Sequence, residues 1–155
     1  MKKILVLFAL VIIAFINRSE AQMPAFSFFD LEGNAFSQTS LDDERPAMIM
    51  LFDPYCDHCD QQAGWISEAA EKLENVQFVF VTIEPEKEPV QQFRDKHFEK
   101  TSIRDVHFLQ DLNFQFEAYF GYSDDAVNIY LYQPGRKKLK YFGKETEVDE
   151  LLKYL

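Results

Sequence analysis

The sequence has few of the residues that interrupt regular structure, and this limits the classes of protein to which it can belong. It contains 5 glycines and 6 prolines in 155 residues, whereas phenylalanine occurs 16 times. It shows no repeat, no low-complexity tract and no internal linker. A chain with so many large apolar side chains is not disordered, and its length suits one domain with a sizeable core.

Positive charge is also scarce. Lysine and arginine total 16 against 26 aspartates and glutamates, which gives a formal net charge of −10. Nucleic acids and anionic lipid surfaces are themselves negatively charged, so such an acidic chain is poorly suited to bind them. The composition therefore argues against two common classes of partner.

Only one long apolar run is present, Ile4–Ile16, near the N-terminus. Two lysines precede it, and the small-x-small sequence Ser19–Ala21 follows it. The run is too short to span a bilayer comfortably, and this three-part pattern is typical of a secretory signal peptide. We predict a signal peptide over 1–21 and one domain over 22–155. The protein would then be exported to a periplasmic or other extracytoplasmic compartment, and it would stay membrane-anchored only if the signal is not cleaved.

The chain has only two cysteines, Cys56 and Cys59, so neither has another partner in the sequence. The apolar run Ala47–Phe52 before them predicts a buried strand, and the pattern from Asp60 to Leu73 after them predicts a helix. A strand that leads into Cys-x-x-Cys at a helix start is the thioredoxin-like redox signature. The helix N-terminus would stabilise a thiolate at Cys56, and Cys59 would be the resolving thiol.

Other interpretations of the cysteine pair stay open. A purely structural disulfide would close a very short loop and stabilise little, and half of a zinc site would lack its second Cys/His pair. The motif could also persist as a static disulfide in a binding module. A copper variant could use Cys56, His58 and Cys59, with Asp53 or Asp60 nearby, because thiolate and imidazole groups suit Cu(I).

Hydrophobic patterning predicts strands that alternate with helices, followed by a hairpin and a last helix. Val76–Ile83, rich in valine, phenylalanine and isoleucine, is expected at the centre of a parallel sheet. On the helix after the cysteines, the residues expected to face the sheet are Ala63, Ile66, Ala69, Ala70 and Leu73, with Trp65 at the rim. The remaining predicted elements are two short strands within Phe26–Ser37, a helical turn at Ser40–Asp43 capped by Ser40, a helix at Val90–Phe98, a minor strand at Val106–Leu109, a helix at Phe114–Phe120 stopped by Gly121, strands at Asn128–Tyr132 and Leu139–Phe142 around a Pro134-Gly135 turn, and a helix at Glu147–Leu155.

This order of elements resembles the exported TlpA/ResA-like branch of the thioredoxin superfamily. The segments that carry the resemblance are Phe28-Phe-Asp-Leu-Glu-Gly-Asn, Tyr55-Cys-Asp-His-Cys59 and Tyr132-Gln-Pro-Gly-Arg-Lys, within a match over Phe26–Leu155. The resemblance implies an α/β thioredoxin-like fold, with a central mixed sheet flanked by helices and an added N-terminal β-hairpin. It also implies thiol–disulfide exchange with cysteine pairs of other exported proteins, in a monomer that a further redox partner recycles. No cofactor is expected besides the Cys56–Cys59 disulfide.

The chain departs from the family at three places. Tyr55 stands where the family usually has tryptophan. Val127 stands where relatives carry a cis-proline, so we expect a trans peptide bond there, weaker substrate docking and easier metal access to the sulfurs. Met50 occupies the place of the buried acid, and the resemblance suggests Glu84 or Glu86 as the proton acceptor for Cys59.

Side chains beside the motif are expected to tune it. A protonated His58 would favour the Cys56 thiolate, and Asp57 would oppose it. His97 and His107 lie in distant segments and are expected to be surface or packing residues. An aromatic group precedes Val127 and is expected to be mostly core, although exposed Phe116 and Tyr122 would form a hydrophobic patch for a protein partner; the group comprises Phe114, Phe116, Tyr119, Phe120 and Tyr122.

Overall fold

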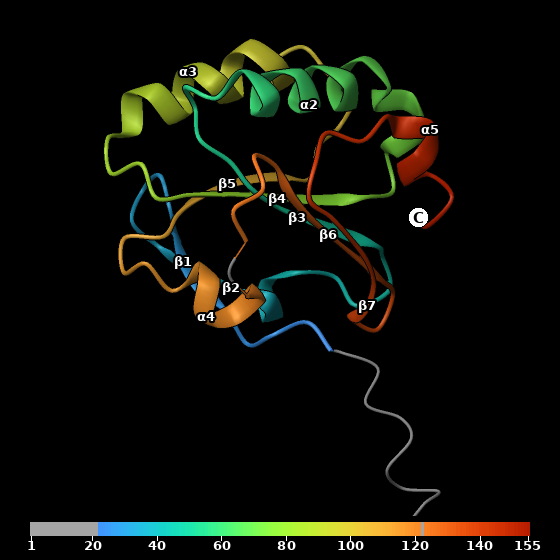
Figure 1. Cartoon of the computed structure of the whole chain (residues 1–155), viewed down its shortest axis with the longest axis horizontal. Helices are drawn as coiled ribbons and strands as arrows, with labels where there is room; N and C mark the ends of the chain where they lie inside the picture. The colour runs from blue at the N-terminus through green and yellow to red at the C-terminus, as the bar shows by residue number, and fades with distance from the viewer. Residues whose placement is uncertain (1–21, 122) are drawn as a thin grey trace, which may run out of the picture.

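The computed structural model describes residues 22–121 and 123–155, so the predicted signal peptide lies outside the described residues. The described chain forms a seven-stranded mixed sheet with the order β2-β1-β5-β4-β3-β6-β7 (Figure 1). The strands are β1 (Ser27–Asp30), β2 (Ala35–Ser37), β3 (Ala47–Leu51), β4 (Gln77–Thr82), β5 (Val106–Gln110), β6 (Asn128–Gln133) and β7 (Lys137–Phe142).

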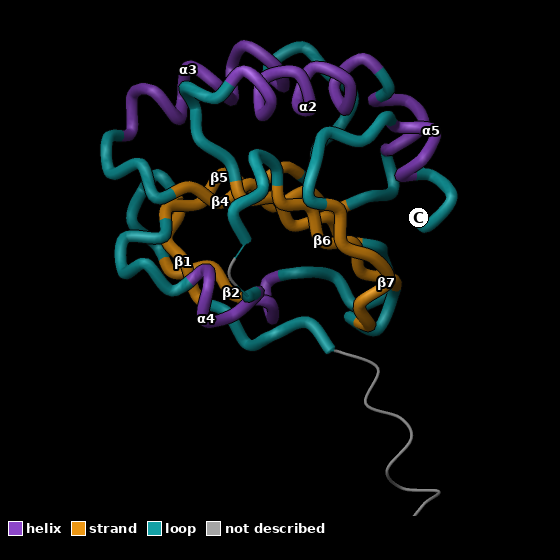
Figure 2. Tube along the Cα trace, viewed as in Figure 1, coloured by secondary structure: helices purple, strands orange, loops and turns teal. Residues whose placement is uncertain are grey.

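Helices cover both faces of this sheet, as Figure 2 shows. One face carries the two long helices and the short C-terminal one, and the other face carries two short elements. The elements of the first face are α2 (Asp57–Glu68), which the 3-10 turn η2 (Ala70–Leu73) follows, α3 (Lys87–Phe98) and α5 (Val148–Leu151); those of the second are α4 (Phe116–Phe120) and the 3-10 turn η1 (Gln38–Ser40).

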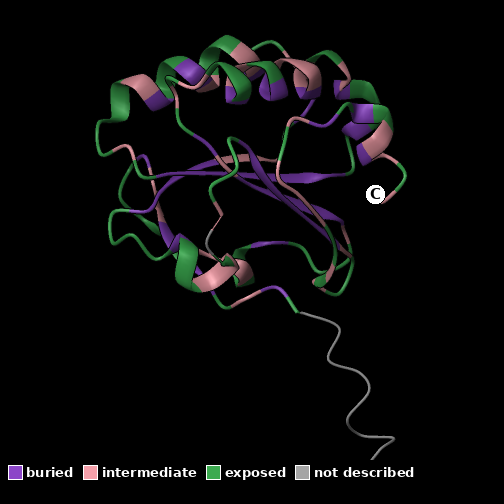
Figure 3. Ribbon diagram, viewed as in Figure 1, coloured by how far each residue is buried: buried purple, intermediate pink, exposed green. Residues whose placement is uncertain are grey.

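The central strand is β4, as its apolar sequence predicts. All of its residues are buried, and it pairs in parallel with β3 on one side and β5 on the other. Its alternating side chains enter two separate cores, with Phe78 and Phe80 under α2 and α3 and Val79 and Val81 on the opposite face. Figure 3 shows the corresponding stripe of buried residues on the inner side of each long helix. Burial on both faces explains why the strand has no polar alternation.

Phenylalanine fills both cores. Under the long helices, the rings of Phe80 and Phe108 stack with centroids 5.0 Å apart, and Phe52 packs against Phe93 at 4.8 Å. On the other face, Phe26 and Phe28 of the N-terminal hairpin region stack at 5.3 Å. These contacts fix the end of β3, which leads directly into the cysteine motif.

The helix after the cysteines and the C-terminal helix differ from their predicted bounds. The helix after the cysteines begins at Asp57 rather than Asp60, because Cys56 caps it before its apolar stripe starts, and it breaks at Ala69 into the turn η2. Ala69 is therefore only half-buried, whereas the rest of the predicted stripe is buried. The C-terminal helix covers only Val148–Leu151, since the chain then turns with the Tyr154 N–H bonded to the Leu151 carbonyl.

Two further predictions are corrected. The segment predicted as a minor strand is β5, which lies inside the sheet between β4 and β1. The helical turn predicted at Ser40–Asp43 lies earlier in the chain, as η1 (Gln38–Ser40). Ser37 rather than Ser40 caps it, and the Ser40 hydroxyl accepts the Ser37 N–H. Both segments are short, so their apolar pattern alone does not fix the structure. The paired strands decide the place of β5, and the capping residue decides where η1 begins.

A buried polar pair ties the segment before α5 to the cysteine helix. The Gln62 side chain is fully buried and donates to the Thr146 carbonyl at 3.1 Å. It also accepts the Thr146 N–H at 2.7 Å. The two ends of the Gln62 amide thus satisfy both Thr146 backbone groups, which would otherwise be buried without a partner.

We expect Gln62→Leu to lower the free energy of unfolding by about 2–4 kcal/mol, because it leaves both Thr146 backbone groups buried and unpaired. Urea unfolding measures this. Gln61→Leu is the matched control, since Gln61 is exposed on the same helix. Equal effects of the two substitutions would contradict the role of the Gln62 pair.

Candidate dithiol site

Cys56 lies at the N-terminus of α2, where a turn built by Asp53 presents it. The Asp53 carboxylate accepts the Tyr55 N–H at 2.8 Å, and the Asp53 carbonyl accepts the Cys56 N–H at 3.1 Å. The Cys56 sulfur then caps the helix by accepting the Cys59 N–H at 3.4 Å. Cys56 is half-buried, so its sulfur sits at the positive end of the helix dipole within reach of a partner.

Cys59 lies one turn further in and is 1% exposed. Its Sγ approaches the Ala126 carbonyl at 3.8 Å. Burial raises the pKa of the Cys59 thiol to about 12, and the neighbouring Cys56 and the charge of Asp53 add to the shift, while a hydrogen bond from the Asp53 backbone opposes it. Both cysteines are free thiols in the structure. The site therefore pairs an accessible sulfur with a buried one that keeps its proton.

Asp53 lies near Cys59, since its backbone hydrogen-bonds the thiol and its charge makes the smallest contribution to the raised pKa. Glu84, which with Glu86 is suggested as the proton acceptor for Cys59, accepts the Glu86 N–H at 2.8 Å. Loss of hydration and the charges of Glu84 and Asp53 raise the pKa of Tyr55, which is 70% exposed. The charge of Glu84 therefore acts on Tyr55, the exposed residue before Cys56.

His58 forms an ion pair with Glu145, in the segment before α5. The Glu145 backbone and His58 lower the pKa of the Glu145 carboxyl. Asp57, the other residue between the cysteines, is exposed. His58 is therefore paired with Glu145, an acid 87 residues away, while it lies beside Cys56. No local pattern could have indicated this pair.

His97 is closer to the motif than its sequence position indicates. Its Nε2 lies 2.8 Å from the carboxylate of Asp60, the residue after Cys59, and its side chain is nearly buried against Phe93. Hydrogen bonds from Lys96 and from His97 lower the pKa of Asp60. This cluster joins α3 to the start of α2. His107, as expected, is a packing residue, paired with Asp105 and set against Phe36.

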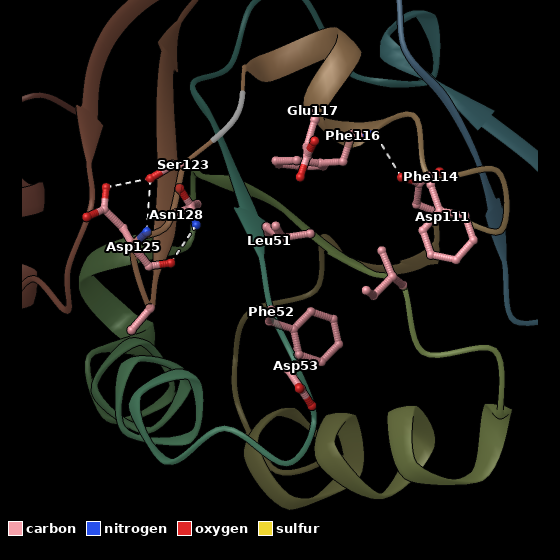
Figure 4. Close-up of a pocket in the computed structure, with 12 residues that line it drawn as sticks. Leu51, Phe52, Asp53, Asp111, Phe114, Phe116, Glu117, Ser123, Asp125 and Asn128 are labelled. Carbon is pink, nitrogen blue, oxygen red and sulfur yellow. Dashed lines mark hydrogen bonds between the residues drawn. The ribbon is translucent and has the colours of Figure 1, made fainter.

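The segment 123–127 closes the site above Cys59. Val127 is fully buried, and its peptide bond is trans, as expected, since the described residues contain no cis bond. A polar cluster holds the segment. The Tyr141 hydroxyl lies 2.7–2.9 Å from acceptor oxygens of Ser123, Asp125 and Asn128, and the Asn128 amide donates to the Asp125 carbonyl (Figure 4).

A cavity of about 440 Å³ opens beside the dithiol (Figure 4). The ends of β3 and β4, the region of α4 and the segment 123–126 enclose it; its lining residues are Leu51, Phe52, Asp53, Ile83, Asp111, Phe114, Phe116, Glu117, Ser123, Asp125, Ala126 and Asn128. Asp53 and Ala126 belong both to this cavity and to the surroundings of Cys59.

Phe116 does not contribute to an exposed hydrophobic patch. Phe116 is buried, and Tyr122 lies outside the described residues. The exposed large apolar side chains in this region are instead Tyr55, Ile83, Leu112 and Phe114. Phe116 is buried because its ring packs on Phe28 and Phe120, which the local sequence does not reveal.

Comparison with solved structures identifies this architecture. A secreted Mycobacterium tuberculosis disulfide oxidoreductase homologous to E. coli DsbE matches with a TM-score of 0.66 at 22% identity, over 82% of this chain and 91% of that one. The chain has a thioredoxin-like fold. No family model and no curated protein matches its sequence.

Two further structures share the thioredoxin-like fold. A secreted thiol-disulfide isomerase from Corynebacterium glutamicum matches with a TM-score of 0.72 at 12% identity, over 86% of this chain and 82% of that one. Arabidopsis thaliana ScoI with copper bound matches with a TM-score of 0.66 at 16% identity, over 86% of this chain and 94% of that one. The N-terminal hairpin and mixed sheet expected from the sequence are thus both present.

Neither a metal cluster nor a membrane span is found within residues 22–121 and 123–155. No three His, Cys, Asp or Glu side chains of these residues converge to hold a metal ion. None of their helices is both long and apolar enough to cross a membrane.

Gly143 is tightly fitted to the polar cluster, because a Cβ there would lie 2.1 Å from the Asp125 carboxylate oxygen. Hydrogen bonds from Ser123 and Tyr141 lower the pKa of Asp125 below its ordinary value of 3.8. We expect Gly143→Ala to displace the carboxylate from these donors and to raise its pKa toward 3.8, as measured by NMR titration. Gly64→Ala, with nothing within 4 Å, is the control and should leave the Asp125 pKa unchanged. An unshifted Asp125 pKa in Gly143→Ala would refute this account of the segment.

Proposed function

We propose that the chain is an exported thiol–disulfide oxidoreductase that exchanges electrons with cysteine pairs of other exported proteins. The observation that carries the proposal is the unequal exposure of the two sulfurs. Cys56 is accessible at a helix N-terminus, whereas Cys59 is buried one turn inside. A two-cysteine exchange requires this arrangement, because one thiol must reach the substrate disulfide first and the other must attack only after the mixed disulfide has formed.

The reaction is a pair of sulfur displacements. The Cys56 thiolate attacks one sulfur of a substrate disulfide, which forms a mixed disulfide and releases the other substrate sulfur as a thiolate that takes up a proton. Cys59 then loses its proton and attacks the Cys56 sulfur, which releases the second substrate thiol. The substrate gains two electrons and two protons in total, and the Cys56–Cys59 pair becomes a disulfide. An unidentified redox partner would reduce it again.

The helix terminus and the buried environment act on different steps. The Cys56 sulfur accepts the Cys59 N–H and so lies at the helix end, where the first attack would take place. Burial keeps Cys59 protonated, so it does not compete for the first attack. Asp53, whose charge acts on Cys59 and whose turn presents Cys56, links the two. The resemblance of this chain to the TlpA/ResA-like branch favours the reductive direction.

A copper-binding variant is the second candidate. Its support is the copper-bound structure among the relatives of the same fold, together with Cys56, His58 and Cys59 on one short segment. Within residues 22–121 and 123–155 no three His, Cys, Asp or Glu side chains converge on a metal position, which disfavours it. Titration with Cu(I) against a competing chelator separates the two candidates.

The test of the exchange function combines a potential with a trap. Equilibration against glutathione should give a reversible couple between about −120 and −300 mV. Cys59→Ser should accumulate mixed disulfides with exported proteins, because resolution is blocked, whereas the matched variant Cys56→Ser should accumulate none. A pair that stays oxidised well below that range, with nothing trapped on Cys59→Ser, would mean a structural disulfide in a binding module.

The raised pKa of Cys59 predicts how the stability of the dithiol form depends on pH. The folded thiol ionises at about 12 and an unfolded one near 9.0, so unfolding releases a proton above pH 9. Stability is therefore complete below about pH 9 and falls as pH rises toward 12. In Cys59→Ala the fall should begin only near pH 10, where tyrosines such as Tyr130 (pKa raised to about 12) take over. Thermal unfolding of the reduced proteins measures this, and identical pH profiles would contradict it.

A further inference from the structure

We propose that the cavity beside the dithiol binds an apolar side chain within a positively charged segment of the protein whose disulfide meets Cys56. The inference rests on the proposed exchange function and specifies its substrate class. It comes from three features of the cavity: its position, the charge of its lining and an unusual aromatic residue at its mouth.

The position links the cavity to the reacting sulfurs. Asp53 forms part of its wall and also builds the turn that presents Cys56. On the opposite side, Ala126 lines the cavity and its carbonyl faces the Cys59 sulfur. A protein bound by a disulfide to Cys56 would therefore pass next to the cavity, and its volume of about 440 Å³ lies within the range of ordinary ligand pockets.

The charge of the lining selects the occupant. Every charged residue among the lining residues described is acidic: Asp53, Asp111, Glu117 and Asp125. Asp111 and Asp125 accept hydrogen bonds from neutral groups, and none of the four forms an ion pair with a described residue. A further acid, Glu84, follows the lining residue Ile83 in the chain, and its charge acts on Tyr55. Such uncompensated negative charge attracts lysine and arginine and repels acidic segments.

Phe114 marks the apolar part of the site. It is 70% exposed at the cavity wall, near Ile83, which is 53% exposed. Its φ is +53°, a left-handed conformation that bulky side chains rarely adopt. Neither packing nor backbone conformation favours phenylalanine here. Functional sites are where such strain is retained, so the residue is suited to contact a partner.

Three synthetic peptides with the same internal disulfide test the proposal. Their flanks are lysine–leucine–lysine, glutamate–leucine–glutamate and lysine–serine–lysine. Reduction by the dithiol protein at low salt should be about tenfold faster for the first than for the second, and the difference should shrink at high salt. The first should also react several-fold faster than the third, because serine cannot use the apolar wall. Uncharged hydroxyethyl disulfide reports the exchange chemistry alone.

Variants assign the selectivity to the cavity. Glu117→Gln should reduce the ratio between the lysine and glutamate peptides, whereas Glu71→Gln, an exposed acid in η2, should leave it unchanged. Phe114→Asn should reduce the ratio between the leucine and serine peptides without lowering the melting temperature, since asparagine accepts a positive φ more readily. A lower melting temperature would mean that Phe114 supports the fold and would count against this role.

The outcomes distinguish the inference from the function on which it rests. If hydroxyethyl disulfide is reduced but the three peptides react at equal rates, the cavity has no such role and the exchange function stands. The cavity also has no such role if the peptides react at different rates but the two variants change neither ratio. Glu117→Gln would then leave the lysine-to-glutamate ratio intact, and Phe114→Asn the leucine-to-serine ratio. If no disulfide is reduced, the proposed function fails, and the inference fails with it.

Discussion

The hydrogen bond from the Cys59 N–H to the Cys56 sulfur is the contact on which the arrangement of the site depends. It fixes the start of α2, and thereby places one sulfur at the helix end and the other one turn inside, beneath Ala126. Burial then sets Cys59 apart, because it raises the pKa of that thiol. The division of roles in the proposed exchange follows from the place of each sulfur along one helix.

The segment that covers Cys59 reaches its position without proline. A proline ring would restrict the backbone by itself, whereas here Tyr141 and Asn128 hold Asp125 through hydrogen bonds, and Gly143 leaves room for its carboxylate. Hydrogen bonds can break one at a time and respond to ionisation, so this support is softer than a ring. The same segment forms a wall of the acidic cavity, which places the covering of Cys59 and the proposed recognition of the substrate on one structural element.

Local patterns in the sequence determined the scaffold. The valines and phenylalanines of β4 predicted its central place, because a strand buried on both faces lacks polar alternation. The hairpin at Gly33 and the end of α4 at Gly121 followed from residues that adopt a positive φ. Two cysteines three residues apart, with no others in the chain, fixed the candidate site. Each of these signals lies within a few neighbouring residues.

Only the tertiary structure decided which distant side chains meet. Packing brings Glu145 to His58, His97 to Asp60 and Thr146 to Gln62 across 37 to 87 residues, and periodicity carries no record of such pairs. It also decided which aromatic residues before Val127 are buried, since Phe116 found partners in the core while Phe114 remained exposed. A hydrophobic pattern shows that a side chain can be buried. Whether it is buried depends on which surfaces the completed fold brings against it.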